Sequence, residues 1–181
     1  QVAHLPVLRK LKGVEVAAIC DADFPKARAL ADRFQVESAF DDIEDLLANS
    51  ELDAVVICTP NHLHEGHVLA ALSAGLHVLV EKPITQTPGQ ARELIDVAAW
   101  HDRVLQVGHL ERFNAAIVAL GDTLGKPRFI ESHRLAPFKE RGTDVNVVLD
   151  LMIHDIDLIQ SLVGAPIESI DAVGAPVFSP E

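Results

Sequence analysis

The segment His77-Val-Leu-Val-Glu-Lys-Pro-Ile84 joins a short apolar run to a charged pair and a proline. Gly75 precedes the run, and glycine commonly follows the last turn of a helix, so residues 77–80 begin a new element. Their β-branched and leucine side chains are typical of a strand that is buried on both faces in a parallel sheet. Pro83 cannot continue the strand, which places Lys82 at its carboxyl end, where open α/β sheets bind ligands.

Strand-like and helical patterns alternate on both sides of this segment. Pro25 and Thr87 are typical of helix starts. We predict buried strands at 14–20, 52–59 and 103–108, and helices at 4–11, 24–34, 43–48 (capped by Asp41), 62–73 and 87–100. Such alternation predicts βαβ units, hence a doubly wound parallel α/β sheet that lacks its first strand.

The alternation changes after Gly108. We predict a helix at 111–124, a half-solvated strand at 128–134, a helix at 147–163 and a strand at 167–173. The change places a domain boundary near residues 110–125, which we set as a first domain at 1–115 and a second at 116–181. The chain starts directly in a helical pattern, so we expect it to be a fragment of a longer protein.

Composition excludes several classes of protein. The formal net charge of −12 and an aromatic content of 4% argue against a nucleic-acid partner. No apolar run reaches the roughly eighteen residues of a membrane span, and no signal peptide is recognisable. Cys20 and Cys58 each end a strand-like run, which favours free thiols in a reducing cytoplasm over a disulfide or a metal pair.

Two further segments carry polar residues where a cofactor would bind. Asp21 follows the strand at 14–20, where a carboxylate accepts hydrogen bonds from a ribose, although a surface Asp in a turn is equally common. The segment Thr59-Pro-Asn-His-Leu-His64 leads from a strand into a helix N-terminus, which suits a phosphate or ribose. His64 and His67 share a helix face, but no carboxylate or Cys completes zinc-like spacing, so we expect no metal.

The most specific polar pattern in the second half is Asp150-Leu-Met-Ile-His154-Asp-Ile-Asp157. Asp150 and His154 are four residues apart and would be neighbours on one helix face, with Asp157 close by. A carboxylate beside an imidazole raises its basicity, as a general base for a hydroxyl proton requires. A surface ion pair would explain the spacing equally well. The surrounding leucine, isoleucine and methionine side chains favour a buried helix, whose polar groups need partners.

Together these motifs resemble the Gfo/Idh/MocA family of nicotinamide-dependent oxidoreductases. The resemblance covers the whole chain, in the order Asp21, Thr-Pro-Asn-His-Leu-His at 59–64, Ala-Gly-Leu-His-Val-Leu-Val-Glu-Lys-Pro at 74–83, Gly108-His109, Arg112-Phe-Asn114 and Asp150-x-x-x-His154. It implies an N-terminal Rossmann domain and a second α+β domain with an open, largely antiparallel sheet, both incomplete in this chain. It also implies homodimers or homotetramers of the full-length protein.

The resemblance further implies that NAD is the cofactor and that the reaction oxidises a secondary hydroxyl of a sugar to a ketone. Lys82, Asp150 and His154 would be catalytic. The cofactor would contact a larger set: Asp21, Thr59, Pro60, Asn61, His64, Glu81, Lys82, His109 and Arg112. Either His154 is the base and Lys82 stabilises the alkoxide, or these two roles are exchanged.

Residues 133–144 and the segment that follows are similar to the sugar-nucleotide branch of this family, which implies a nucleotide sugar such as a UDP-sugar as substrate. Arg134, Lys139 and Arg141 would then contact a diphosphate, although a solvated charged loop explains them equally well. The alternatives are a cyclitol or free-sugar dehydrogenase of the same family, and a non-catalytic NAD-binding regulatory homologue.

Overall fold

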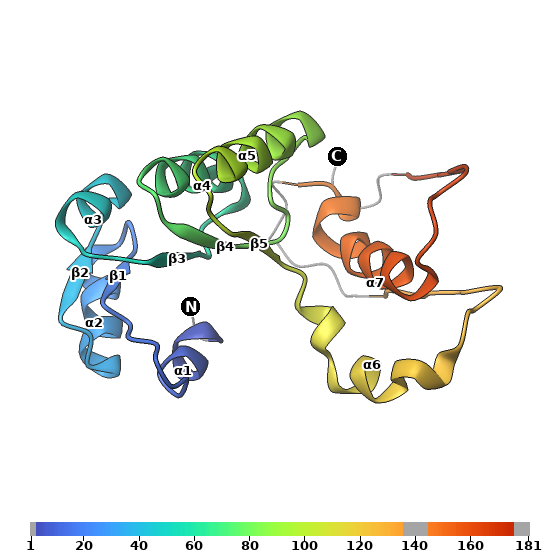
Figure 1. Cartoon of the computed structure of the whole chain (residues 1–181), viewed down its shortest axis with the longest axis horizontal. Coiled ribbons are helices and arrows are strands. Elements are labelled where there is room, and N and C mark those ends of the chain that lie inside the picture. Colours follow the sequence, from blue (N-terminus) through green and yellow to red (C-terminus); the bar gives the residue numbers. More distant parts are fainter. Residues whose placement is uncertain (1–2, 136–144, 176–181) are drawn as a thin grey trace.

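The fold is known from a computed structural model, which describes residues 3–135 and 145–175 (Figure 1). The strands in the first part of the chain form two parallel sheets. Strand β1 (Ala18–Cys20) pairs with β2 (Ser38–Phe40). Strands β3 (Ala54–Ile57), β4 (His77–Glu81) and β5 (Leu105–Gly108) form the second sheet in the order β3-β4-β5.

The order of these strands is that of a doubly wound sheet. In that topology the first strand lies between the strands that correspond here to β1 and β3. The described residues supply no strand at that place, so the two sheets correspond to the two halves of a doubly wound sheet. Within each sheet the strands run in parallel, so their carboxyl ends lie at one edge of that sheet. The predicted α/β class is therefore confirmed.

Local signals in the sequence explain the helices of this part. Helix α2 (Phe24–Phe34) begins at Asp23, whose side chain accepts a hydrogen bond from the Lys26 backbone N–H. Helix α5 (Pro88–Trp100) begins with a capping box between Thr87 and Gln90. The other helices are α1 (His4–Leu8), α3 (Ile43–Asn49) and α4 (His64–Ser73), the last preceded by a 3₁₀ turn at Asn61–Leu63.

One predicted cap is wrong. The side chain of Asp42, not that of Asp41, accepts hydrogen bonds from the backbone N–H groups of Glu44 and Asp45 at the start of α3. Asp42 has extended backbone angles and directly precedes the first helical residue, which is the geometry that an N-cap requires.

Each sheet has its own buried core. Ile19 of β1 packs with residues of α1 and α2, and Val78 and Val80 of β4 pack under α4 and α5. The central cluster is the larger one and consists of Ile57, Val68, Ala71, Leu72, Val78, Val80, Leu94 and Ala98. Since β4 lies between β3 and β5 and beneath two helices, its carboxyl end is held firmly in place.

The second part of the chain is helical where it is described. The predicted helix at 111–124 is divided into a 3₁₀ turn (Leu110–Phe113), α6 (Ala115–Leu120) and a second 3₁₀ turn. Asn114 makes the first break, because its non-helical backbone lets its side chain cap α6. A π-helical turn (Val148–Met152) leads directly into α7 (Ile153–Val163).

The strands predicted at 128–134 and 167–173 are not strands in this structure. A strand exists only through hydrogen bonds to a neighbour, and neither segment has such a partner among the residues described. The expected antiparallel sheet is therefore not seen in the described part of the chain. None of the described helices combines the length and apolar character needed to cross a membrane.

Candidate active site

Lys82 and Asp150 meet at the carboxyl end of β4. The Lys82 ammonium donates to the backbone carbonyl of Asp150 at 2.6 Å and to its carboxylate at 3.1 Å. The two side chains are 18% and 35% exposed, so the contact is partly shielded from solvent. Sixty-eight residues separate the partners, and the contact brings the π-helical turn before α7 to the edge of the sheet.

His154 lies in the first turn of α7, next to this contact. Its Nδ1 atom is buried and has no hydrogen-bond partner among the residues described. Burial lowers the pKa of His154 below its ordinary value of 6.5, and the positive charges of Lys82 and Arg134 lower that pKa further. The imidazole is therefore neutral near pH 7 and can accept a proton.

Asp150 was predicted to orient His154, and the structure pairs Asp150 with Lys82 instead. Residues four apart are neighbours on one face only in a regular α-helix. Asp150 lies in a π-helical turn, whose wider winding changes which side chains share a face. Such turns occur frequently at functional sites.

The loop after β3 is fixed by a buried histidine. The His64 side chain is fully buried, with Nδ1 2.7 Å from the carbonyl oxygen of Pro83 and Nε2 3.0 Å from that of Thr59. The Thr59 hydroxyl also hydrogen bonds with His67. The predicted contact between His64 and the cofactor is therefore not supported, because this side chain has no exposed surface and instead joins the loops after β3 and β4.

Pro60 and Asn61 stay close to this edge of the sheet. Pro60 is exposed, and Asn61 begins the 3₁₀ turn that leads into α4. Both residues remain predicted cofactor contacts.

Asp21 directly follows β1, at the carboxyl end of that strand. Its carboxylate accepts a hydrogen bond from the backbone N–H of Asp23 and forms an ion pair with Lys26. The position is the one expected for a ribose-binding carboxylate at the end of the second strand.

His109, Arg112 and Asp157 form a second contact between the sheet and α7. The Arg112 guanidinium donates two hydrogen bonds to the Asp157 carboxylate, one of them at 2.7 Å, and thereby lowers the pKa of that carboxyl. The Nδ1 atom of His109 lies 3.9 Å from the same carboxylate. Arg112 was predicted to bind the cofactor, but in the structure its guanidinium pairs with Asp157, a residue expected only to lie near His154.

Glu81 completes this edge beside Lys82. Its carboxylate lies 2.8 Å from Nε2 of His4 on α1, a residue that sequence reasoning did not place in the site. A Cβ atom at Gly108 would lie 3.2 Å from Glu81 Oε2, so a larger residue there would require this carboxylate to shift by a few tenths of an ångström. The spacing of 77 residues between His4 and Glu81 gives no local signal in the sequence.

Residues 1–109 match the family described as "Oxidoreductase family, NAD-binding Rossmann fold". The chain belongs to the Gfo/Idh/MocA family. It is 40% identical to the UDP-N-acetylglucosamine 3-dehydrogenase of Acidithiobacillus ferrooxidans over 88% of this chain and 50% of that protein. It is 33% identical to the inositol 2-dehydrogenase of Leifsonia xyli, over 91% of this chain and 50% of that one.

A solved structure of the Acidithiobacillus enzyme has the same fold. It superposes with a TM-score of 0.82 and 39% identity, over 91% of this chain and 54% of that chain. This chain thus spans about half the length of the Gfo/Idh/MocA relatives that it matches.

Arg134 was predicted to contact a diphosphate in a Gfo/Idh/MocA protein of the sugar-nucleotide branch. In the structure its guanidinium donates to Asp155 at 2.5 and 3.0 Å, which lowers the pKa of the Asp155 carboxyl. Lys139 and Arg141 lie outside the described residues. The diphosphate contact therefore remains a prediction.

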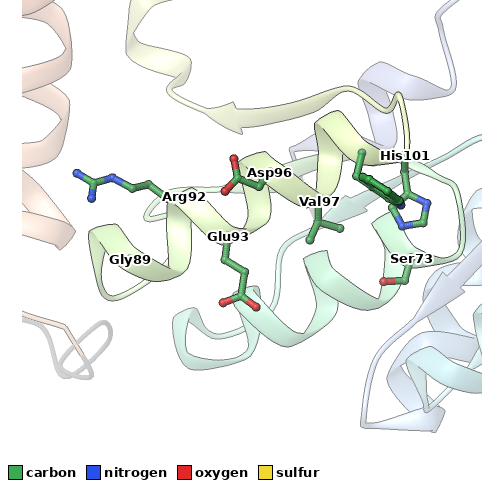
Figure 2. A pocket seen from close by; sticks show the side chains of 8 residues that line it. Ser73, Gly89, Arg92, Glu93, Asp96, Val97 and His101 are labelled. Carbon is green, nitrogen blue, oxygen red and sulfur yellow. The ribbon is translucent and has the colours of Figure 1, made fainter.

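A hollow of about 600 Å³ lies elsewhere on this Gfo/Idh/MocA chain, along α5 and the end of α4 (Figure 2). Ser73, Arg92, Asp96 and His101 are among the residues that line it. None of the predicted site residues borders it. We therefore place the candidate active site at the carboxyl edge of β4, where Lys82, Asp150 and His154 lie, and not in this hollow.

Proposed function

We propose that the protein oxidises a secondary hydroxyl of a sugar to a ketone with NAD, and that the sugar is part of a UDP-sugar. The observation that carries this proposal is the contact of Lys82 with Asp150 beside the neutral His154, at the carboxyl edge of a sheet of the NAD-binding family. The relative with 40% identity supports the choice of a nucleotide sugar.

The described residues suit NAD in this position. Asp21 would hold the adenosine ribose, and Thr59, Pro60 and Asn61 at a strand-to-helix junction would lie along the cofactor. Glu81 and Lys82 end β4 and His109 follows β5, so all these residues stand at one edge. Bound there, NAD supplies the acceptor for the hydride of the alcohol.

In this proposal His154 accepts the proton of the substrate hydroxyl. Its imidazole is neutral, so one of its two ring nitrogens carries a lone pair that can take this proton. Lys82 hydrogen bonds to the oxygen and stabilises the negative charge that develops on it. Asp150 holds the Lys82 ammonium in position through two hydrogen bonds and does not act on His154.

A second candidate substrate is a cyclitol or free sugar. The 33% identity to an inositol 2-dehydrogenase, over nine-tenths of this chain, favours it. Turnover of a panel of UDP-sugars, free sugars and inositols with NAD separates the two candidates. Oxidation of inositol alone would replace the UDP-sugar, and NAD binding without turnover of any panel member would favour the regulatory homologue.

We also propose that the second domain begins near residue 116 and takes part in a homodimer or homotetramer. Supporting this division, the last strand of the second sheet ends at Gly108, and Phe113 and Phe129 beyond it are 70% and 82% exposed. Exposed aromatic side chains of this size are typical of surfaces that contact another element or subunit.

Asp21 is expected to make the protein prefer NAD over NADP, because a carboxylate at the ribose repels a 2′-phosphate. Asp21→Ala should weaken NAD binding by about tenfold, the effect of losing a hydrogen bond to a charged group. Titration of both cofactors, followed by fluorescence, measures this preference. Asp41→Ala is the matched control, since Asp41 is exposed and caps no helix. Tighter binding of NADP to the unaltered protein would contradict the assignment.

The acid limb of kcat/KM is expected to lie below pH 6.5, because the lowered pKa of His154 keeps its imidazole neutral into the acid range. Besides Lys82 and Arg134, Glu111 and His109 act on this imidazole, and Glu111 alone of the four raises its pKa. Arg134→Gln removes a positive charge, so the pKa of His154 rises and the acid limb moves to higher pH. Arg134→Lys keeps the charge and should leave the limb nearly in place. A limb that does not move in Arg134→Gln would show that His154 is not the titrating base.

A further inference from the structure

We propose that His4, Cys58 and Glu81 form a binding site for a thiophilic divalent cation such as Zn²⁺. The three residues come from different elements: α1, the end of β3 and the end of β4. Each offers one ligand atom, and the three atoms lie within 4.8 Å of one another. No other such group of three occurs among the residues described.

The ligand set suits zinc. A thiolate sulfur, an imidazole nitrogen and a carboxylate oxygen are the three kinds of ligand that zinc takes in proteins. Three protein ligands leave a fourth position for water or another molecule. No metal was expected from the sequence, because closely spaced ligands are absent and this cluster joins the distant positions 4, 58 and 81.

Two features already hold the ligands in place. The His4 imidazole and the Glu81 carboxylate are in direct contact at 2.8 Å, so a cation would replace the hydrogen between them. Glu81 also rests against Gly108, where a larger residue would displace its carboxylate. All three ligands are half-buried, and this gives a cation access from solvent.

Cys58 is the ligand whose protonation must change when a cation binds. Burial raises the pKa of its thiol, and coordination of a cation through sulfur requires that this thiol lose its proton. The free state is then a neutral thiol beside a His–Glu pair.

The site lies beside Lys82, at the edge where we propose that NAD binds. A bound cation would then compete with the cofactor, a consequence that rests on the proposed function. The metal site itself does not depend on that function, and the two are tested separately.

Cobalt is a suitable probe, because Co²⁺ takes tetrahedral zinc sites and a Co²⁺–thiolate bond gives a charge-transfer absorption band. We expect the full chain to bind one Co²⁺ with such a band, and Zn²⁺ to displace it. Cys58→Ser should abolish the band. His4→Gln should weaken Co²⁺ binding by more than about tenfold, since even the loss of an outer-sphere partner costs about 10–100-fold.

Cys20→Ser is the matched control, because Cys20 is the other free cysteine of the chain, is half-buried and ends β1. Its Co²⁺ spectrum should equal that of the unaltered protein. The proposal is overturned if the band is absent, if it survives in Cys58→Ser, or if it disappears in Cys20→Ser. Circular dichroism of each variant checks that the fold is intact.

A final titration adds NAD to the cobalt-loaded protein. Loss of the band on NAD addition supports the metal site and its overlap with the cofactor. A band that resists saturating NAD supports the metal site and places the cofactor elsewhere. NAD binding in a protein that gives no band refutes the metal site and leaves the proposed function standing.

Discussion

Lys82→Ala and His154→Ala are each expected to lower kcat for sugar oxidation by roughly a hundredfold or more, the scale of a lost general acid–base group. Lys82 donates to Asp150 at the end of β4, and His154 presents a buried nitrogen without a partner among the described residues. Steady-state rates with saturating NAD and the true substrate measure the effect. NAD affinity should be nearly unchanged in His154→Ala, because this side chain is carried by α7 and not by the loops that follow the strands.

Two substitutions serve as controls for this experiment. His133 is an exposed histidine paired only with Glu131 within the described structure, and Lys126 is an exposed lysine. His133→Ala and Lys126→Ala should keep near-normal kcat. If His154→Ala and Lys82→Ala also kept it, the reaction would take place elsewhere and the proposed site would be wrong.

Arg112→Ala is expected to lower the free energy of unfolding by about 2 kcal/mol. It leaves the Asp157 carboxylate, which is 9% exposed, without its two hydrogen bonds. Breaking a fully buried pair costs about 3–5 kcal/mol, and we expect less because the Arg112 side chain is 48% exposed. Urea unfolding measures the difference.

The matched control for this loss is Arg128→Ala. Arg128 is exposed and belongs to the same part of the chain, and its replacement should change stability by less than about 0.5 kcal/mol. Asp157→Asn should retain one hydrogen bond and lose less than Arg112→Ala. Equal stability of Arg112→Ala and Arg128→Ala would mean that the contact between Arg112 and Asp157 contributes nothing.

Much of the first part of the chain could be predicted because its signals are local. The apolar runs that became β3, β4 and β5, and the helix-start signals at Pro25 and Thr87, each act over a few residues. Strand β2 was missed because Ser38–Phe40 is too short for a periodic pattern and is a strand only through its pairing with β1.

The site was predicted less completely, since its contacts join distant positions. Lys82 and Asp150 were both predicted to be catalytic. Their direct contact depends on a π-helical turn, which no local sequence pattern predicts. Asp157 as partner of Arg112, and His4 as partner of Glu81, arise only when the chain has folded. The predicted contact of His64 with the cofactor is not supported, because helix position and residue type do not reveal that this side chain is fully buried.

The contacts of the buried His64 imidazole are costlier to break than the contact between Lys82 and Asp150 on the other side of the site. Its two ring nitrogens lie within hydrogen-bond distance of the carbonyl oxygens of Pro83 and Thr59, so this one side chain connects the loops after β3 and β4. Separating them would leave buried polar groups without partners, at a cost of about 1–3 kcal/mol each. The contact between Lys82 and Asp150 is partly exposed, so breaking it costs less free energy. We therefore expect the turn that carries Asp150, and not the loops after β3 and β4, to move first when this edge of the sheet opens.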